Sequence, residues 1–169
     1  SPGMSHETKN KVTLEYLNSL GVLSTNINAN NNWKDDNKLT NIRNTRGYHS
    51  FDQVDCSNLS NEIKDKFFTE HLHIDEEIRL ILTGKGYFDI RDKNDKWIRI
   101  CVTSGVLVIF PAGIWHRFAV SKDDNNNLKA IRLFTTEPKW TAYNRHDKKI
   151  LDDNNVVKSI YNDYPFIII

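Results

Sequence analysis

The sequence predicts an all-β protein, an antiparallel sandwich or barrel with a few short flanking helices. The length of 169 residues suits a single domain that can bury its own core. Between residues 69 and 136, short runs rich in isoleucine, valine, phenylalanine and tyrosine alternate with turn sequences that contain glycine, proline or aspartate. These runs are close together and evenly spaced, which is typical of antiparallel sheets.

The chain divides into segments of different character. The first three residues, Ser1-Pro2-Gly3 before Met4, are typical of an expression scar. We expect residues 4–169 to form one domain without internal repeats. It consists of a mostly helical N-terminal part, a β-barrel core and a C-terminal segment, at residues 11–68, 69–136 and 137–169.

Two short helices are predicted in the N-terminal part. Thr13 is a suitable N-cap for the first, and Gly21 is a suitable stop. The apolar face of this helix would comprise Leu14, Leu17 and Leu20. The second helix is predicted over residues 60–68, with Ser60 as its cap. The asparagine-rich stretch at residues 26–37 is interpreted as a solvated loop or a low-complexity insertion.

Six strands are predicted in the β core. They cover residues 78–82, 87–91, 97–102, 106–110, 116–121 and 128–135. Asp123 to Asn127 is predicted to be a polar hairpin tip. After Trp140 the pattern weakens. Residues 156–160 permit a helix there, and residues 165–169 are either an edge strand or an apolar tail.

Charge and cysteine content exclude several classes of protein. The 23 basic and 22 acidic side chains give a net charge of +1 and form no basic block, which argues against a nucleic-acid binder. No apolar run approaches the ~20 residues that a membrane span requires. The two cysteines, Cys56 and Cys101, are too few for a disulfide framework and suit a reducing compartment. The sequence therefore predicts a cytoplasmic globular domain.

Three histidines and one glutamate give the clearest functional signal. His71 and His73 are two residues apart, so on a strand both imidazoles would lie on the same face. Glu77 has the same parity, and we expect its carboxylate to join them unless a bulge intervenes. His116 follows a Pro-Ala-Gly turn, where the returning chain could bring it opposite the other three.

This set of side chains suits a borderline divalent metal such as Fe(II), Ni(II), Mn(II) or Co(II). An octahedral ion with four protein ligands would keep two adjacent positions open for a substrate with two oxygen ligands. One negative charge among the ligands would leave the ion Lewis acidic. A single buried histidine is more often a hydrogen-bonded core residue. The complete spacing H-x-H-x-x-x-E followed by P-x-G-x-x-H favours the metal site.

Arg79 is the candidate catalytic residue. It shares strand parity with Glu77, so we expect it to face the cavity, where a fixed cation could stabilise a bound enolate. The alternative is a surface salt bridge with Asp75 or Glu76.

Longer segments resemble one known family. Residues 70–79 read E-H-L-H-I-D-E-E-I-R, residues 84–92 read G-K-G-Y-F-D-I-R-D, and residues 140–145 read W-T-A-Y-N-R. Together with P-A-G-I-W-H-R-F at residues 111–118, they resemble the two cupin motifs and, more narrowly, the acireductone dioxygenase family of methionine salvage. The resemblance covers most of residues 13–146.

The resemblance implies a fold, a reaction and a cofactor. The fold would be the cupin double-stranded β-helix, a jelly-roll-like barrel. The substrate would be the acireductone 1,2-dihydroxy-3-keto-5-methylthiopentene, oxidised by dioxygen at one Fe(II) or Ni(II) ion per monomer. With Fe(II) the products would be 2-keto-4-methylthiobutyrate and formate. With Ni(II) they would be methylthiopropionate, formate and carbon monoxide. A monomer located in the cytoplasm, and also in the nucleus, is implied.

The resemblance also implies three pocket residues, and the sequence differs from the family pattern at two positions. Phe67, Arg132 and Trp140 match family residues that line or pack near the pocket, with core packing as the alternative. Val106 stands where the family usually has aspartate, and Trp115 where it usually has tyrosine. We expect these departures to affect a local turn and the seating of the substrate, but no metal ligand.

Two other classes of function remain open. A non-catalytic cupin binding module would keep the barrel but usually lose a ligand. A different metal cupin enzyme, of the sugar isomerase or flavonol dioxygenase type, would share the ligands. It would not be expected to share G-Y-F-D-x-R-D or W-T-A-Y-N-R.

Overall fold

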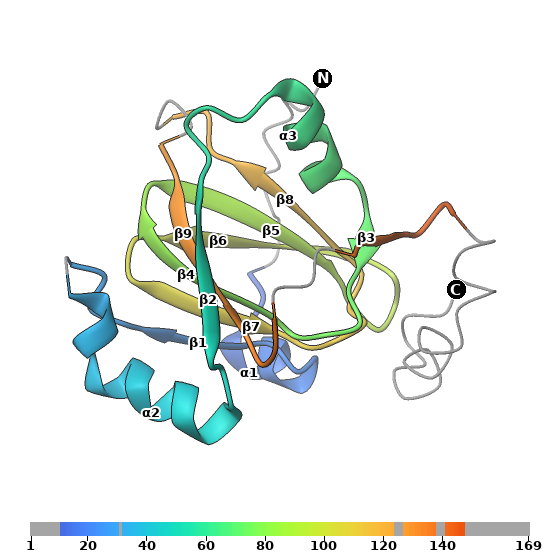
Figure 1. Ribbon diagram of the computed structural model, residues 1–169. Coiled ribbons are helices and arrows are strands. Elements are labelled where there is room, and N and C mark those ends of the chain that lie inside the picture. Colours follow the sequence, from blue (N-terminus) through green and yellow to red (C-terminus); the bar gives the residue numbers. More distant parts are fainter. Residues whose placement is uncertain (1–10, 31, 124–126, 138–140, 148–169) are drawn as a thin grey trace.

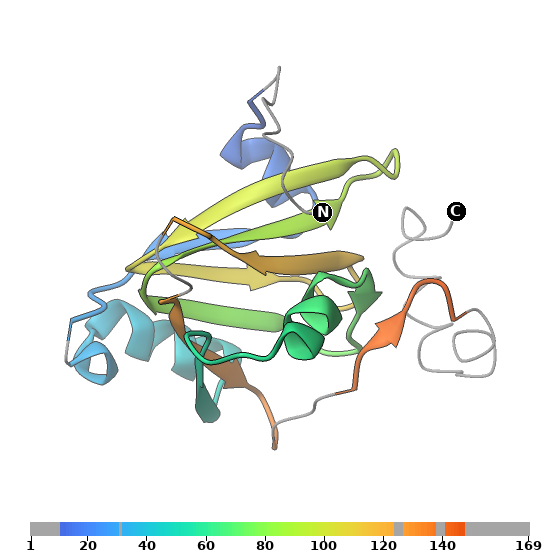
Figure 2. The same ribbon diagram turned by 90° about the horizontal axis from the view of Figure 1, so that it is seen from above.

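The computed structural model describes residues 11–30, 32–123, 127–137 and 141–147, and in them two five-stranded sheets pack face to face (Figure 1, Figure 2). Sheet A contains, in spatial order, β1 (Leu23–Asn26), β7 (Val106–Phe110), β4 (Glu77–Thr83), β9 (Lys129–Phe134) and β2 (Ser50–Asp55). Sheet B contains β10 (Tyr143–Asn144), β3 (His71–Leu72), β8 (His116–Val120), β5 (Lys85–Arg91) and β6 (Trp97–Thr103). All neighbouring strands run antiparallel, which confirms the predicted sandwich.

The six predicted strands are all present, as β4 to β9, with ends shifted by at most two residues. The N-terminal part also contributes two strands that the sequence did not predict. β1 and β2 form the opposite edges of sheet A, where they pair with β7 and β9. Residues 11–68 are therefore part of the sandwich itself as well as its helical cover.

Both predicted helices form with the expected caps. In α1 (Leu14–Ser19) the Thr13 hydroxyl accepts a hydrogen bond from the Tyr16 N–H at 3.1 Å. The chain leaves this helix through Gly21 in the left-handed region, at φ +84°. Leu20 is buried as predicted and Leu17 packs partly buried against the core, but Leu14 at the start of the helix is exposed. The cap of α3 (Asn61–Phe68) is Ser60, as predicted.

The prediction of a solvated loop at residues 26–37 was wrong. The segment contains a 3₁₀ helix, η1 (Trp33–Asp35), and leads directly into α2 (Asn37–Arg46). Ile27, Trp33 and Leu39 are buried in one cluster with residues of sheet A. They cover the outer face of the sheet, on which α2 lies in Figure 1 and Figure 2. The burial of a few apolar side chains is therefore enough to order this stretch against the sheet, although most of its residues are polar.

Strand β4 lies between two clusters of buried apolar side chains, one beneath α2 and one between the sheets. Its inward side chains reach the proposed metal centre. Ile78 and Leu80 point to the cluster beneath α2, and Ile81 belongs to the cluster between the sheets. Since side chains alternate along a strand, Glu77 and Arg79 share the inner face with Ile81. All three line a cavity of about 310 Å³ inside the sandwich.

Several predictions lie outside the described residues. They are the scar at residues 1–3, the helix at 156–160, the segment 165–169 and most of the hairpin tip after Asp123. Among the described residues, no helix has the length and apolar character needed to cross a membrane.

Candidate metal centre

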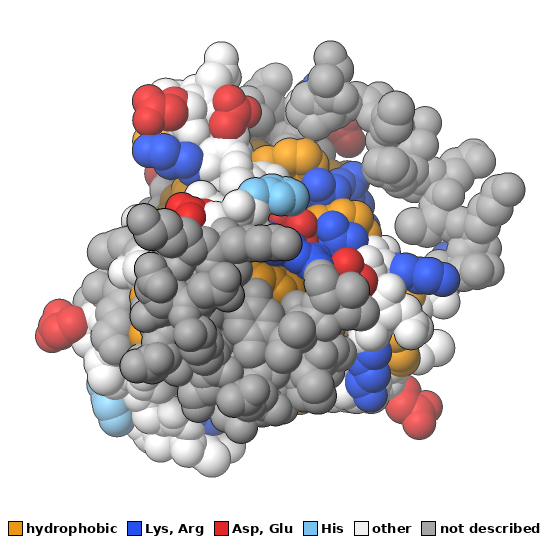
Figure 3. Space-filling view, turned by 90° about the vertical axis from the view of Figure 1, so that its right-hand side faces the viewer, with side chains coloured by type: hydrophobic (Ala, Val, Ile, Leu, Met, Phe, Trp, Pro, Cys, Tyr) orange, Lys and Arg blue, Asp and Glu red, His pale blue; other side chains and the backbone are white. Residues whose placement is uncertain are grey.

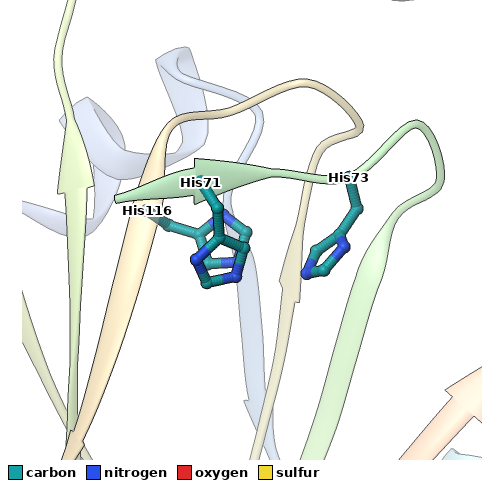
Figure 4. A group of neighbouring side chains, drawn as sticks. All are labelled: His71, His73 and His116. Atoms are coloured by element: carbon teal, nitrogen blue, oxygen red, sulfur yellow. The ribbon is translucent and has the colours of Figure 1, made fainter. Parts of the chain in front are cut away.

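Three histidines meet at the cavity from neighbouring parts of sheet B. His71 lies on β3 and pairs directly with His116, the first residue of β8. His73 follows just after the end of β3. Figure 4 shows the three rings directed to the same side of β3. One nitrogen from each ring lies within 4.8 Å of the others, so the three can hold one ion.

Glu77 lies near the histidines although it is on a different strand and in the other sheet, so the parity argument from the sequence does not apply to it. β3 ends at Leu72, and the chain crosses from sheet B to sheet A before β4 begins at Glu77. The carboxylate nevertheless points back at the same space. Its Oε2 lies 2.7 Å from Nε2 of His116 and 3.1 Å from Nε2 of His73. The expected convergence is present, but it results from packing of the two sheets.

Each histidine is oriented by a backbone carbonyl. The Nδ1–H of His71 donates to the Thr69 carbonyl at 2.6 Å, and that of His116 to the Ile114 carbonyl at 2.9 Å. The Nδ1–H of His73 donates to the Thr141 carbonyl at 3.0 Å. A carbonyl only accepts, so these bonds fix the tautomer and leave the Nε2 lone pairs for another partner. This is the usual arrangement around metal-ligating histidines.

The buried atoms that would bind the metal have the spacing that an ion requires. Glu77 Oε2 and His116 Nε2 are buried, and within the described part of the chain neither has a hydrogen-bond partner. Both are acceptors when the imidazole is neutral, so their approach to 2.7 Å is unfavourable without a cation. Adjacent ligands of an octahedral ion with bonds of ~2.1 Å would lie about 3 Å apart. The separations of 2.7 and 3.1 Å agree with that value.

In the metal-free site the electrostatics favour the metal-binding forms of His71 and Glu77, but not that of His73. Burial, together with the charge of His116, lowers the pKa of His71 to about 4, so this ring is neutral at physiological pH. Burial alone would raise the pKa of Glu77. The charges of Arg79 and His116 instead hold it well below its ordinary value, and the carboxylate is ionised. For His73, burial opposes protonation, but the hydrogen bond and charge of Glu77 raise its pKa above the usual value.

Arg79 lies on the cavity wall beside Glu77. Its Nη2 is 3.0 Å from Oε1 of Glu77, and its Nη1 donates to the carbonyl of Ile78. Of the two alternative partners, Asp75 and Glu76, the second is engaged elsewhere, because it accepts from Arg46 at 2.7 Å and from the Tyr48 hydroxyl at 2.6 Å. A cation is thus held beside the carboxylate at the cavity.

Two of the three predicted pocket residues line the cavity, and Trp140 lies outside the described residues. Phe67 packs edge-on against Phe118 with ring centroids 6.3 Å apart. Arg132 is held by two hydrogen bonds from its guanidinium to Asp52, at 2.7 and 3.0 Å. The remaining wall is largely apolar and includes Val54, Cys56, Ile81, Phe88, Phe118, Leu128 and Ala130.

Sequence reasoning missed two groups at this site. Asp52 was not considered, although the alternation of Asp52 and Val54 with exposed neighbours along β2 could have indicated an inward face. The Thr141 carbonyl could not be found, since a backbone acceptor leaves no residue-type signal.

The two departures from the family pattern are accommodated locally. Gly105 still makes the turn before Val106, at φ +88°, and its N–H donates to the Ile81 carbonyl at 2.9 Å. Trp115 is fully buried, and the Arg145 guanidinium lies 5.5 Å from its ring centroid. Neither residue lines the cavity.

Comparisons with known proteins agree with this geometry. Residues 4–142 match the ARD/ARD′ family. Acireductone dioxygenase 1 from Sorghum bicolor is 49% identical over 146 residues, which cover 83% of this chain and 79% of that protein. A second Sorghum bicolor protein, named probable inactive acireductone dioxygenase 2, is 45% identical over 161 residues, 92% of this chain and 87% of that protein.

A solved structure extends the likeness to three dimensions. Acireductone dioxygenase from Bacillus anthracis, with a cadmium ion in its active centre, superposes with a TM-score of 0.65 at 26% identity. The match covers 76% of this chain and 86% of the Bacillus chain. It confirms the cupin barrel, and with the histidine cluster it identifies a site for a divalent metal ion. The chain belongs to the ARD/ARD′ family.

Proposed function

We propose that this protein is a metal-dependent dioxygenase that cleaves an acireductone with O₂. The observation that carries the proposal is the convergence of three imidazole Nε2 atoms and one buried carboxylate on a single point of the cavity. Arg79 supplies a cation beside that point. The relatives named acireductone dioxygenase support the choice of substrate.

The proposed ligands are His71, His73, Glu77 and His116, with one Fe(II) or Ni(II) ion in each monomer. When bound, the ion supplies Lewis acidity and two open positions for a substrate with two neighbouring oxygens. The proposed products are 2-keto-4-methylthiobutyrate and formate with Fe(II), and methylthiopropionate, formate and carbon monoxide with Ni(II). One set of ligands accepts both ions, so availability decides which is bound.

The protein's own groups have distinct proposed roles. The Arg79 guanidinium stabilises negative charge on the enediolate, and the Glu77 carboxylate beside it fixes the guanidinium. Phe67 and Phe118 exclude water from the reacting end. The apolar wall that includes Cys56 suits the methylthioalkyl part of the substrate. We further propose that the enzyme is a cytoplasmic, and also nuclear, monomer.

Turnover tests the proposal against its alternatives. A relative named probable inactive shares 45% identity with this chain, so activity must be measured directly. Metal-free protein reloaded with Fe(II) or Ni(II) should consume a synthetic acireductone under air faster than the metal-free sample. It should not consume a flavonol or isomerise a sugar phosphate. Headspace carbon monoxide should rise only in the Ni(II) sample. If neither reloaded sample exceeds the metal-free background, the protein is another cupin enzyme or a binding module.

A further inference from the structure

The three histidines differ in where their orienting carbonyls come from. The acceptors of His71 and His116 lie two residues upstream on the same stretch of chain. The acceptor of His73 is the carbonyl of Thr141, 68 residues away. The orientation of His73 therefore depends on a separate segment, residues 141–145, which we term the strap.

The strap is short and three of its five residues are exposed. Strand β10 comprises two residues and pairs with β3, with Tyr143 opposite Leu72 and Asn144 opposite His71. Thr141, Ala142 and Asn144 are exposed. A strand pair this short has marginal stability in water, so other interactions must hold the strap against the sheet.

Arg145 supplies a set of such interactions. Its Nη1 donates to Glu70 Oε1 at 2.8 Å and to Asp95 Oδ1 at 2.7 Å, and its Nη2 donates to Asp95 Oδ2 at 3.0 Å. Its backbone N–H donates to the Glu70 carbonyl at 3.1 Å. The side chain is 14% exposed. Two-pronged pairs of this kind are the stronger ion pairs, and partial burial protects them from solvent.

The partners of Arg145 are themselves anchored. Arg91 on β5 donates to both carboxylate oxygens of Glu70, at 2.8 and 3.2 Å, and to the backbone carbonyl of Asp95 at 2.8 Å. On the side of the molecule that carries β3 and β10, acidic and basic side chains lie intermingled beside a histidine (Figure 3). The strap is thus fastened to Glu70, the residue directly before β3, and to the turn between β5 and β6.

We propose that Arg145 is a positioning residue for the metal centre, which latches the strap so that the Thr141 carbonyl holds the His73 ring. The inference rests on the proposed function in that His73 is taken as a metal ligand. Without the latch, His73 loses its Nδ1 acceptor and its ring gains rotational freedom. His71 and His116 keep their own local carbonyls. Loss of a group that orients a metal ligand typically lowers metal affinity ~10–100-fold.

The first test uses metal-free, ¹⁵N-labelled full-length protein, in which long-range ¹H–¹⁵N spectra report the tautomer of each imidazole. In Arg145→Gln the His73 signals should move toward the averaged values of a free ring, while those of His71 and His116 stay in place. The His73 signals are assigned with His73→Gln. Asp95→Asn weakens the Arg145–Asp95 pair without removing Arg145, so it should shift the His73 signals in the same direction by a smaller amount. The Asp95→Asn variant takes the place of Arg145→Gln if the latter does not fold.

The second test measures affinity for Co(II) alone, by competition with a chelating dye. Arg145→Gln should bind Co(II) ~10–100-fold more weakly than wild type. Arg99→Gln is the matched control. Arg99 is also a partly buried arginine with two bonds to one carboxylate, Asp89, at 2.7 and 2.8 Å. Like Arg145 it does not line the cavity, but its side chain bonds Asp89 on β5 and not the groups that hold the strap. Its affinity for Co(II) should be unchanged.

Two outcomes would overturn the inference. One is an unchanged His73 tautomer together with unchanged Co(II) affinity in folded Arg145→Gln. The other is an equal disturbance of all three histidines, which would mean that Arg145 acts on general stability. Neither test involves acireductone. Wild-type protein that binds Co(II) yet leaves acireductone unconsumed would refute the proposed function and leave the role of Arg145 standing.

Discussion

Replacing Arg79 with alanine removes the guanidinium that lies 3.0 Å from the Glu77 carboxylate on the cavity wall. The four proposed metal ligands remain, so the variant should still load with metal. What it lacks is a fixed cation beside the bound enediolate. The expected result is a metal-loaded enzyme with strongly reduced turnover.

The size of the loss follows from the position of the charge. The Arg79 side chain is 17% exposed, so water screens it only in part. At an effective dielectric constant of ~20, a unit negative charge ~5 Å from a cation gains about 3 kcal/mol. That energy corresponds to a factor of ~10²–10³ in rate. Removal of one donor from an oxyanion site has a similar effect.

The assay compares acireductone consumption by Arg79→Ala, Arg79→Lys and wild type, each with its metal content measured in the same sample. Arg79→Lys keeps the charge but loses the planar guanidinium that contacts both the Glu77 carboxylate and the Ile78 carbonyl, so its rate should lie between the other two. Full activity in metal-loaded Arg79→Ala would refute the role in enolate stabilisation. A loss of activity that only tracks a loss of metal would assign Arg79 to holding Glu77.

Three further predictions concern other groups. Glu77→Ala should retain far less metal than wild type by elemental analysis after dialysis, because the only anionic ligand is lost. Cys101 is exposed, whereas burial raises the pKa of Cys56 to about 11, so a thiol reagent at pH ~8 should modify Cys101 first; equal rates would contradict this. Burial opposes ionisation of Asp89, but the hydrogen bonds from Arg99 and Arg117 lower its pKa. The stabilisation is then present above the unfolded-state pKa of ~4 and is lost as pH falls through the folded-state value. In urea denaturation, Asp89→Asn should therefore cost more stability at neutral pH than near pH ~3, and an equal cost at both would contradict the sign.

Local patterns were enough to predict the central strands and the helix caps. Each of β4 to β9 is a run of strand-forming residues bounded by turn residues, and its own sequence specifies it. Gly84 shows why the turns could be predicted from the sequence: this turn position requires glycine. It has φ +78°, and a Cβ there would lie 2.7 Å from the Leu128 backbone. The hydroxyls of Thr13 and Ser60 cap their helices by contacts three residues away, within the reach of sequence reasoning.

Elements that depend on distant partners were not predictable. β1 and β2 have few apolar residues, and they are strands because they extend the two edges of sheet A. The burial of Trp33 likewise requires the outer face of that sheet. At the site, residue types and spacing indicated all four proposed ligands. Residues 140–145 were recognised as a family motif, but the contact of Thr141 with His73 and that of Asp52 with Arg132 escaped prediction, since they join segments 68 and 80 residues apart.

The most direct test of the account is an anomalous-scattering map of crystals loaded with Co(II) or Ni(II), measured on both sides of the absorption edge of the metal. The account predicts one anomalous peak in each molecule, bound by the Nε2 atoms of His71, His73 and His116 and by a Glu77 oxygen, each at ~2.0–2.2 Å. A peak elsewhere, or one from which any of the four side chains is turned away, would contradict the assignment of this cavity as the metal centre.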